Sequence, residues 1–170
     1  RYAMMHLAED MLMQTGCITP LYYYTDPYML SSTVEGFYAN PFGCKYFHNA
    51  RVSGKTDAIS VCLASEPDSL DPAFNSTVDG ATLLGHLFAG LAKWSLDEKG
   101  QPVVVADCAQ SLPEGTLESD GTVTYTYHLR QDLKWSDGQP LTAQDFVYAW
   151  KRAAADTTGA GQGYLFRVIQ

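Results

Sequence analysis

The sequence predicts an α/β fold in which a mixed sheet has flanking helices and is joined to a small antiparallel meander. Residues 78–91 carry leucines at helical spacing, whereas residues 122–129 alternate as a half-buried strand does. Thr142 and Asp145 have the spacing of a capping box, which predicts a helix that continues to about residue 155. The chain of 170 residues is long enough for one ordinary domain with a hydrophobic core.

The first 48 residues predict one helix and two strands. Apolar residues recur at helical spacing over 3–14, and we expect the methionines of this helix to fill the core. Residues 18–25 are rich in β-branched and aromatic types and favour a strand, as do residues 45–47. Residues 26–43 contain repeated Pro and Gly turn signals, so we expect them to be irregular.

The remainder of the chain predicts alternating strands and helices after a linker. Residues 49–57 are polar and without pattern, which favours a linker. A strand is expected over 58–63, and the leucines of the helix over 78–91 form one apolar stripe. A strand over 92–96 and an antiparallel meander over 111–135 complete the predicted sheet elements.

Composition excludes several classes of function. The formal net charge of −8 argues against nucleic-acid binding and against a polybasic membrane-surface helix. No stretch approaches the roughly 18 apolar residues of a membrane span. Cys17, Cys44, Cys62 and Cys108 form no C-x-x-C pair, so a metal site is not expected. Buried free thiols are the preferred interpretation, although a disulfide stays open.

The sequence holds no recognisable catalytic constellation. It lacks a G-x-S-x-G elbow, a P-loop and an H-E-x-x-H motif. Its histidines, His6, His48, His86 and His128, are scattered, and we expect each to be a surface residue or a hydrogen-bonded structural one. We therefore expect no catalytic residues, no cofactor and no metal, and we do not expect an enzyme.

A long motif carries a family resemblance. The stretch YTYHLRQDLKWSDGQPLTAQDFVYAWKR, residues 125–152, combines a strand, an aromatic-x-Asp-Gly turn, a capped helix and a basic helix end. Upstream, SLDP at 69–72, LFAGL at 87–91 and AD at 106–107 fit the same pattern. Together they resemble the oligopeptide/dipeptide/nickel class of ABC-importer solute-binding proteins, known as family 5. The resemblance implies part of a type II periplasmic-binding-protein lobe.

The order of the segments differs from the family pattern. Residues 1–48 contain AEDMLM, PLYYY, VEGF and NPFG, which resemble the family's carboxyl-terminal end. Residues 58–170 resemble its amino-terminal portion, and the linker over 49–57 joins the two segments. We expect both to pack as one compact unit, because neighbouring termini tolerate joining. A circular permutation, an engineered fusion or a natural rearrangement would each give this order.

The resemblance implies a ligand and a partner. Family members bind short peptides mainly through the peptide backbone, without chemical conversion, and pass them to an ABC transporter permease. The family's backbone-pairing segment aligns with Ser76, Thr77 and Val78, flanked by Phe74 and Asn75. Helix capping is an equally weighted interpretation for these residues. The expected location is extracytoplasmic, in the periplasm or lipid-anchored at the outer face of the membrane.

Other functions stay open at this stage. Nickel-, heme- and sugar-binding relatives share the signature, so the ligand can belong to another class. The acidic residue that captures the peptide's amino group lies in a part of the family pattern that this sequence lacks. We therefore expect weak or no peptide binding by the chain alone. An inactive structural fragment that needs a complementary chain, or a homodimer, is the further alternative.

Overall fold

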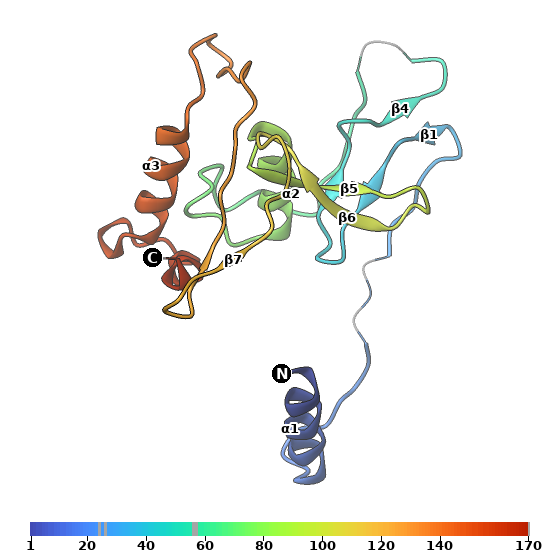
Figure 1. Cartoon of the computed structure of the whole chain (residues 1–170). Coiled ribbons are helices and arrows are strands. Elements are labelled where there is room, and N and C mark those ends of the chain that lie inside the picture. The colour runs from blue at the N-terminus through green and yellow to red at the C-terminus, as the bar shows by residue number, and fades with distance from the viewer. Residues whose placement is uncertain (24, 26, 56–57, 170) are drawn as a thin grey trace.

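The computed structural model describes residues 1–23, 25, 27–55 and 58–169, and it contains three α-helices in that part (Figure 1). The helices are α1 (Tyr2–Gln14), α2 (Val78–Leu87) and α3 (Ala143–Ala154), followed by the 3-10 turns η1 (Asp156–Thr158) and η2 (Gly163–Val168). The strands are β1 (Val34–Glu35), β2 (Tyr38–Ala39), β3 (Lys45–Tyr46), β4 (Arg51–Val52), β5 (Ala92–Leu96), β6 (Pro102–Ala106), β7 (Thr116–Leu117) and β8 (Val123–Thr124).

The combination of helices and strands agrees with the predicted class, but among the described residues the strands form separate two-stranded antiparallel sheets and not one mixed sheet. Within the described residues the pairs are β1–β4, β2–β3, β5–β6 and β7–β8. The longest pair is β5–β6, in which Trp94 lies opposite Val104. The Asp97 carboxylate closes its turn, because it accepts hydrogen bonds of 2.8 Å from the backbone N–H groups of Lys99 and Gln101. This hairpin confirms the strand predicted over 92–96.

Helix α2 is shorter than the prediction over 78–91. Phe88 already has extended dihedral angles, φ −124° and ψ 146°, and the helix ends there. The residues that follow pair with the chain after β6, where Gly90 O accepts from Cys108 N at 3.0 Å and Leu91 O accepts from Asp107 N at 2.9 Å. The predicted stripe is not a buried face either, since Leu87 is 61% exposed.

Helix α3 and the meander follow the local signals. The Asp145 carboxylate accepts hydrogen bonds from the backbone N–H and the hydroxyl of Thr142, at 2.7 and 2.8 Å, which confirms the capping box. The α3 helix then packs on η2, with the rings of Trp150 and Phe166 at 6.1 Å. The meander is present but shorter than expected, because only β7 and β8 are strands and Ala109 and Leu129 form an isolated bridge.

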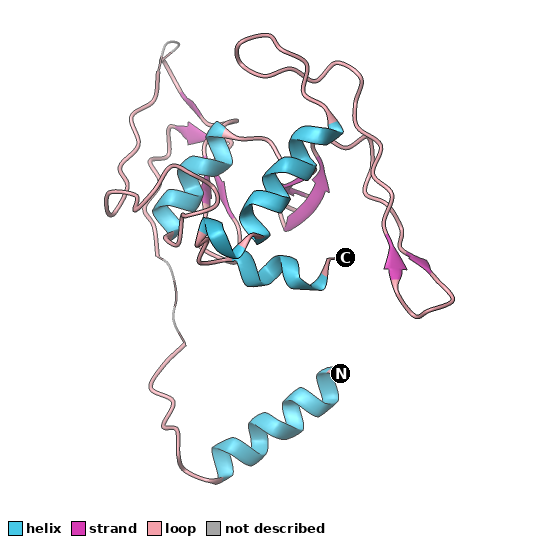
Figure 2. Cartoon of the chain, turned by 90° about the vertical axis from the view of Figure 1, so that its left-hand side faces the viewer, coloured by secondary structure: helices cyan, strands magenta, loops and turns pink. Residues whose placement is uncertain are grey.

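The amino-terminal segment departs most from prediction. Helix α1 is present, but the expectation that its methionines fill the core is wrong, since no residue of the helix is buried. Figures 1 and 2 both show α1 apart from the other elements at the end of an extended connection. Residues 18–23 and 25 form no strand, and Tyr24 and Asp26 lie outside the described residues. Without a packed neighbour, aromatic β-propensity alone does not make a strand.

The predicted linker is also partly ordered. Within 49–57, strand β4 pairs antiparallel with β1, which brings Val52 opposite Val34. Thr56 and Asp57 of this range lie outside the described residues. The strand expected over 58–63 is wrong, because this stretch has no strand partner. The range 26–43, expected to be irregular, contains the short strands β1 and β2.

The buried core is small and lies around β2, the loop before α2 and the chain after β6. Its apolar members are Tyr38, Ala73, Cys108 and Ala109. All the cysteines are free thiols, so the expected burial holds for Cys108 and is wrong for Cys17 and Cys62, which are exposed. Among the described residues, no helix has the length and apolarity needed to cross a membrane.

Candidate functional site

The candidate ligand-binding residues, Phe74 to Val78, lie at the end of a tightly hydrogen-bonded loop that leads into α2. The loop turns at Asp71, whose backbone oxygen accepts from the N–H groups of Phe74 and Asn75 at 3.0 and 3.1 Å. Its carboxylate accepts from Ala73 N at 2.9 Å. Asp and Pro at this point of the sequence favour such a turn, so the loop conformation follows from local residue types.

A second carboxylate, Asp68, holds the middle of the candidate segment. It accepts hydrogen bonds from the backbone N–H and the hydroxyl of Ser76, at 3.0 and 2.6 Å. The Thr77 hydroxyl lies 3.2 Å from the other oxygen of Asp68. These hydrogen bonds lower the pKa of Asp68, with the Ser76 hydroxyl as the largest cause. The polar side chains of Ser76 and Thr77 are therefore directed at their own loop.

The capping interpretation holds for Thr77, and Asn75 supports it. The Thr77 hydroxyl oxygen accepts from Gly80 N at 3.1 Å, which satisfies one of the unpaired N–H groups at the start of α2. The Asn75 side-chain amide donates to Thr77 O at 3.0 Å. Gly80 leaves room for this side chain, because a Cβ there would come within 1.8 Å of Asn75 Oδ1.

Helix α3 fixes the loop from the other side. The Arg152 guanidinium donates to both carboxylate oxygens of Asp71, with Nη1–Oδ1 at 2.9 Å and Nη2–Oδ2 at 2.5 Å. The same guanidinium lies over the Phe74 ring, 5.5 Å from its centroid. These bonds lower the pKa of Asp71 to about 2, with the hydrogen bond from Arg152 as the main cause and the Ala73 N–H next. Arg152, which lies 78 residues further along the chain, thus positions Phe74.

The groups that stay available are main-chain acceptors and two apolar side chains. Within the described part of the chain, the carbonyl oxygens of Phe74, Asn75 and Ser76 accept no hydrogen bond, whereas their N–H groups are all used. Phe74 and Val78 are 43% and 49% exposed. The segment can accept hydrogen bonds from a ligand N–H and offer apolar contact beside them.

Asp68, Asp71 and Arg152 were not among the residues singled out for the site. Asp71 belongs to the SLDP motif and Arg152 to the basic helix end, so both lay inside the recognised pattern. Their pairing across the chain had no signal in the sequence. Asp68 had one usable signal, since an acidic residue in a Pro-bounded loop before a Ser-Thr cap can serve such a network.

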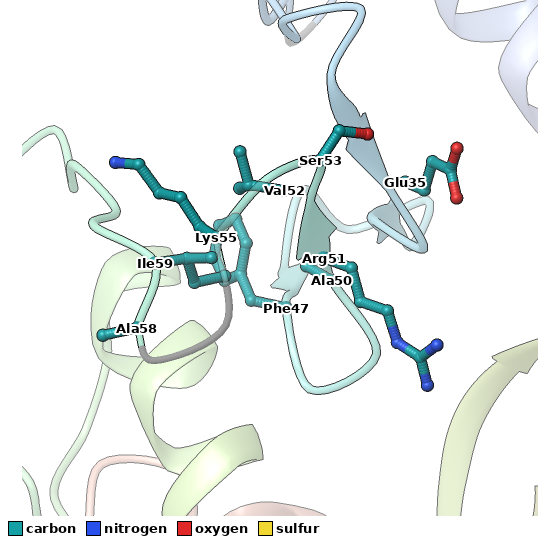
Figure 3. Close-up of a pocket in the computed structure, with 9 residues that line it drawn as sticks. All are labelled: Glu35, Phe47, Ala50, Arg51, Val52, Ser53, Lys55, Ala58 and Ile59. Atoms are coloured by element: carbon teal, nitrogen blue, oxygen red, sulfur yellow. The ribbon is translucent and has the colours of Figure 1, made fainter.

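Two cavities lie away from this segment. The larger, about 650 Å³, is at the paired strands β1 and β4 and is shown in Figure 3. There Lys55, Phe47 and Ile59 lie on one side, whereas Arg51 and Glu35 point to the other, so the charges do not converge. The second, about 430 Å³, lies between β3, α2 and β5 and contains His48 and His86. Residues 74–78 line neither cavity.

Comparison with known protein families finds a match in the part of the chain that follows residues 74–78. A family model described as "Bacterial extracellular solute-binding proteins, family 5 Middle" matches residues 103–169. This part of the chain is similar to that family. The match contains the β7–β8 hairpin, the capping box and Arg152, and it therefore agrees with the resemblance seen over 125–152.

Similar proteins of known name agree with the match. The periplasmic oligopeptide-binding protein OppA of Escherichia coli K12 is 42% identical over 96 residues, 56% of this chain and 16% of that protein. The dipeptide-binding protein of Lactococcus lactis is 33% identical over 111 residues, 65% of this chain and 19% of that protein. The probable deoxycholate-binding periplasmic protein YgiS of Escherichia coli is 42% identical over 102 residues, 59% of this chain and 18% of that protein. The chain thus spans about a fifth or less of these relatives. All three are named as binding proteins.

Proposed function

We propose that the chain is part of the substrate-binding component of an ABC peptide importer and binds short peptides without converting them. The observation that carries the proposal is the family 5 match over residues 103–169. Relatives named for oligopeptide and dipeptide binding, at 42% and 33% identity, support peptides as the ligand class. The proposed partner is a membrane permease, and the proposed location is extracytoplasmic, as the periplasmic names of two relatives suggest.

The proposed ligand contacts are the main-chain oxygens of residues 74–76. Every peptide carries the same N–H donors, so pairing with these acceptors gives affinity with little preference for side chains. Phe74 and Val78 would contact the peptide side chains on either side of the paired segment. The loop is rigid before the ligand arrives, because Asp68 and Arg152 hold it, and rigidity lowers the entropy that binding costs.

The chain alone supplies one wall of a site. Asp68 already accepts from Ser69, Ser76 and Thr77, and Asp71 is paired with Arg152, so neither carboxylate is available for a peptide's amino group. We therefore expect the isolated chain to bind peptides with a Kd of about 1 mM or weaker, which corresponds to roughly −4 kcal/mol. A complementary chain, or the rest of a longer protein, would complete the cleft.

A second ligand class has one observation in its favour. The relative named as a probable deoxycholate-binding periplasmic protein is as similar in sequence as the oligopeptide-binding one, at 42% identity. Deoxycholate has isolated hydroxyl donors but no regular row of N–H groups, so it would rely on Phe74 and Val78 and pair fewer of the free carbonyl oxygens. Pairing of those oxygens favours the peptide.

Native mass spectrometry of the purified chain, followed by calorimetric titration, tests the proposal. We expect peptide adducts or a bound second chain in the mass spectrum, and weak heats with a tri- and tetrapeptide mixture at millimolar concentration. Deoxycholate is the matched comparison, and binding of deoxycholate without peptide would favour the second class. Binding of neither compound, with no peptide adduct and no second chain in the mass spectrum, would reject the binding function. Micromolar peptide binding by the monomer would reject the one-wall description.

A further inference from the structure

The second cavity contains a histidine whose two ring nitrogens both bind main-chain groups. His86 Nε2 lies 2.8 Å from Phe47 N, and His86 Nδ1 lies 2.6 Å from Thr82 O. The Phe47 N–H can only donate, so Nε2 must be the unprotonated nitrogen, and the proton must reside on Nδ1, which faces a carbonyl. The contact with Phe47 therefore exists only while the His86 ring is neutral.

A second histidine lies beside it in the same cavity. The Tyr38 hydroxyl donates to Trp94 O at 2.7 Å, which leaves the Tyr38 oxygen to accept from His48 Nε2 at 3.3 Å. The His48 and His86 rings are 5.9 Å apart between centroids. The pKa of His48 is lowered, first by its partial burial and then by His86 and Lys93, while Asp107 acts in the opposite direction.

These contacts join two segments that are far apart in the sequence. Phe47 N and Lys45 N bind to α2 through His86 and Thr82, and Tyr38 binds to β5 through Trp94. Ring stacking adds to them, with Phe47 and His86 at 5.7 Å. The hydrogen bonds to His86 are thus part of what holds residues 37–48 on α2 and β5.

We propose that His48 and His86 form an acid-sensitive latch, which holds residues 37–48 on α2 and β5 at neutral pH and releases them when the rings take up protons. A protonated His86 would direct an N–H at the Phe47 N–H, so that contact is lost. Both rings are exposed enough for water to reach them, so protonation needs no prior unfolding. Water is then the better partner for the charged ring.

The surrounding charges do not offer a replacement partner. Asp107 is the acidic group in the cavity, and it is engaged by Lys93 Nζ at 3.0 Å. That pair contributes little net charge at the rings. The titratable and charged groups that line the cavity or contact the two rings are Tyr38 on β2, Tyr46 on β3, Lys93 on β5 and Asp107 after β6.

The direction of the pH effect follows from His48. Its folded-state pKa lies below the ordinary value of 6.5, so the unfolded chain binds more protons than the folded chain in that range. The stabilisation is present above pH 6.5 and is lost as the pH falls through and below that value.

Amide hydrogen exchange, corrected for intrinsic rates, tests the latch. From about pH 7.5 to about pH 5 we expect the protection of the Phe47 and Lys45 amides to fall about fivefold, the value of one net hydrogen bond. Amides in the β5–β6 hairpin serve as the internal reference and should change little. His86→Gln should diminish the pH response, and the matched control His128→Gln, in an exposed part of the meander, should retain it in full.

A second readout keeps the test independent of variant folding. Imidazole nitrogen shifts of the unmodified chain should place the His86 proton on Nδ1 at about pH 7.5, where the ring is neutral. A His86 proton on Nε2 at that pH, unchanged Phe47 protection down to about pH 5, or an undiminished response in His86→Gln would each overturn the latch.

Discussion

Helices α1 and α3 are both amphipathic, yet only α3 is held by the rest of the chain. Helix α3 has the Thr142–Asp145 capping box at its start, basic residues in its last turn and the Arg152–Asp71 ion pair to a distant loop. Helix α1 has no side-chain cap and no buried residue. The difference teaches that helical periodicity predicts a helix, whereas packing depends on specific anchors elsewhere in the chain.

Glycine-to-alanine substitutions should give the largest difference in unfolding free energy between the packed part of the chain and α1. Gly36 has φ +75°, and a Cβ there would lie 2.1 Å from Asn49 O, so Gly36→Ala combines backbone strain with a main-chain clash. We expect a loss of about 2–4 kcal/mol in the free energy of unfolding. Gly16 after α1 has a similar φ of +66° but no neighbour within 4 Å. Gly16→Ala carries that backbone strain without the clash, so it should cost only about 1 kcal/mol in the same urea titration. Equal effects would contradict the contrast.

Apolar truncations give the next largest contrast. Trp150 on α3 contacts Phe166, so Trp150→Ala should lower the free energy of unfolding by about 1–2 kcal/mol through lost apolar burial. Leu7 on α1 is 61% exposed, and Leu7→Ala should be neutral within about 0.5 kcal/mol. Urea unfolding followed by circular dichroism measures both. A cost for Leu7→Ala equal to that of Trp150→Ala would mean that α1 packs on the body in solution.

A smaller effect is expected at the start of α2. Gly80→Ala would displace the Asn75 side chain, and we expect a net loss of about 1 kcal/mol after the gain in helix propensity. In an Asn75→Ala background the same change should be neutral or stabilising, because Asn75 Oδ1, the atom closest to the added Cβ, is absent. Thermal unfolding of the single and double variants measures the coupling. Additive effects would show that Asn75 and Gly80 do not contact each other.

The smallest stability effect should come from the anchor of α3. Asp71→Asn removes the charge that pairs with Arg152, and solvent screening keeps the loss in unfolding temperature small at neutral pH. The pKa of Asp71 is about 2 in the folded chain and ordinarily 3.8, so the pair stabilises above pH 3.8 and is lost as the pH falls towards 2. The difference between the two proteins should therefore vanish at the acid end. A difference that is as large at pH 2 as at neutral pH would contradict the ion-pair assignment.

The comparison also shows which features the sequence could reveal. Signals that lie within a few residues of one another predicted the helix starts correctly. The Thr142–Asp145 capping box begins α3, and Thr77 caps α2. The strand predicted over 58–63 failed, because strand formation depends on a partner that local composition does not specify. The prediction that the methionines of α1 fill the core failed for the same reason, since periodicity defines an apolar face of a helix but not the element that covers it.

The candidate site was partly predictable. The family pattern pointed to residues 74–78, and their position at a helix start agreed with the capping signal. The network that holds them is formed by Asp68 in the same loop and Arg152 on α3, and it joins residues separated by up to 81 positions. No local pattern encodes such a contact. The His86–Phe47 hydrogen bond likewise joins the two segments of the chain, and only the folded arrangement reveals it. The permuted order of those segments stays a prediction.

Amide NMR titration with a tripeptide tests the central proposal most directly. The spectrum reports on every residue and detects binding near a Kd of about 1 mM, where calorimetry is weak. The account predicts saturable shifts confined to residues 74–78 and their neighbours in the Asp68 loop, with α1 and the β1–β4 cavity unaffected. Shifts centred on either cavity, or none near residues 74–78 at saturating peptide, would contradict it.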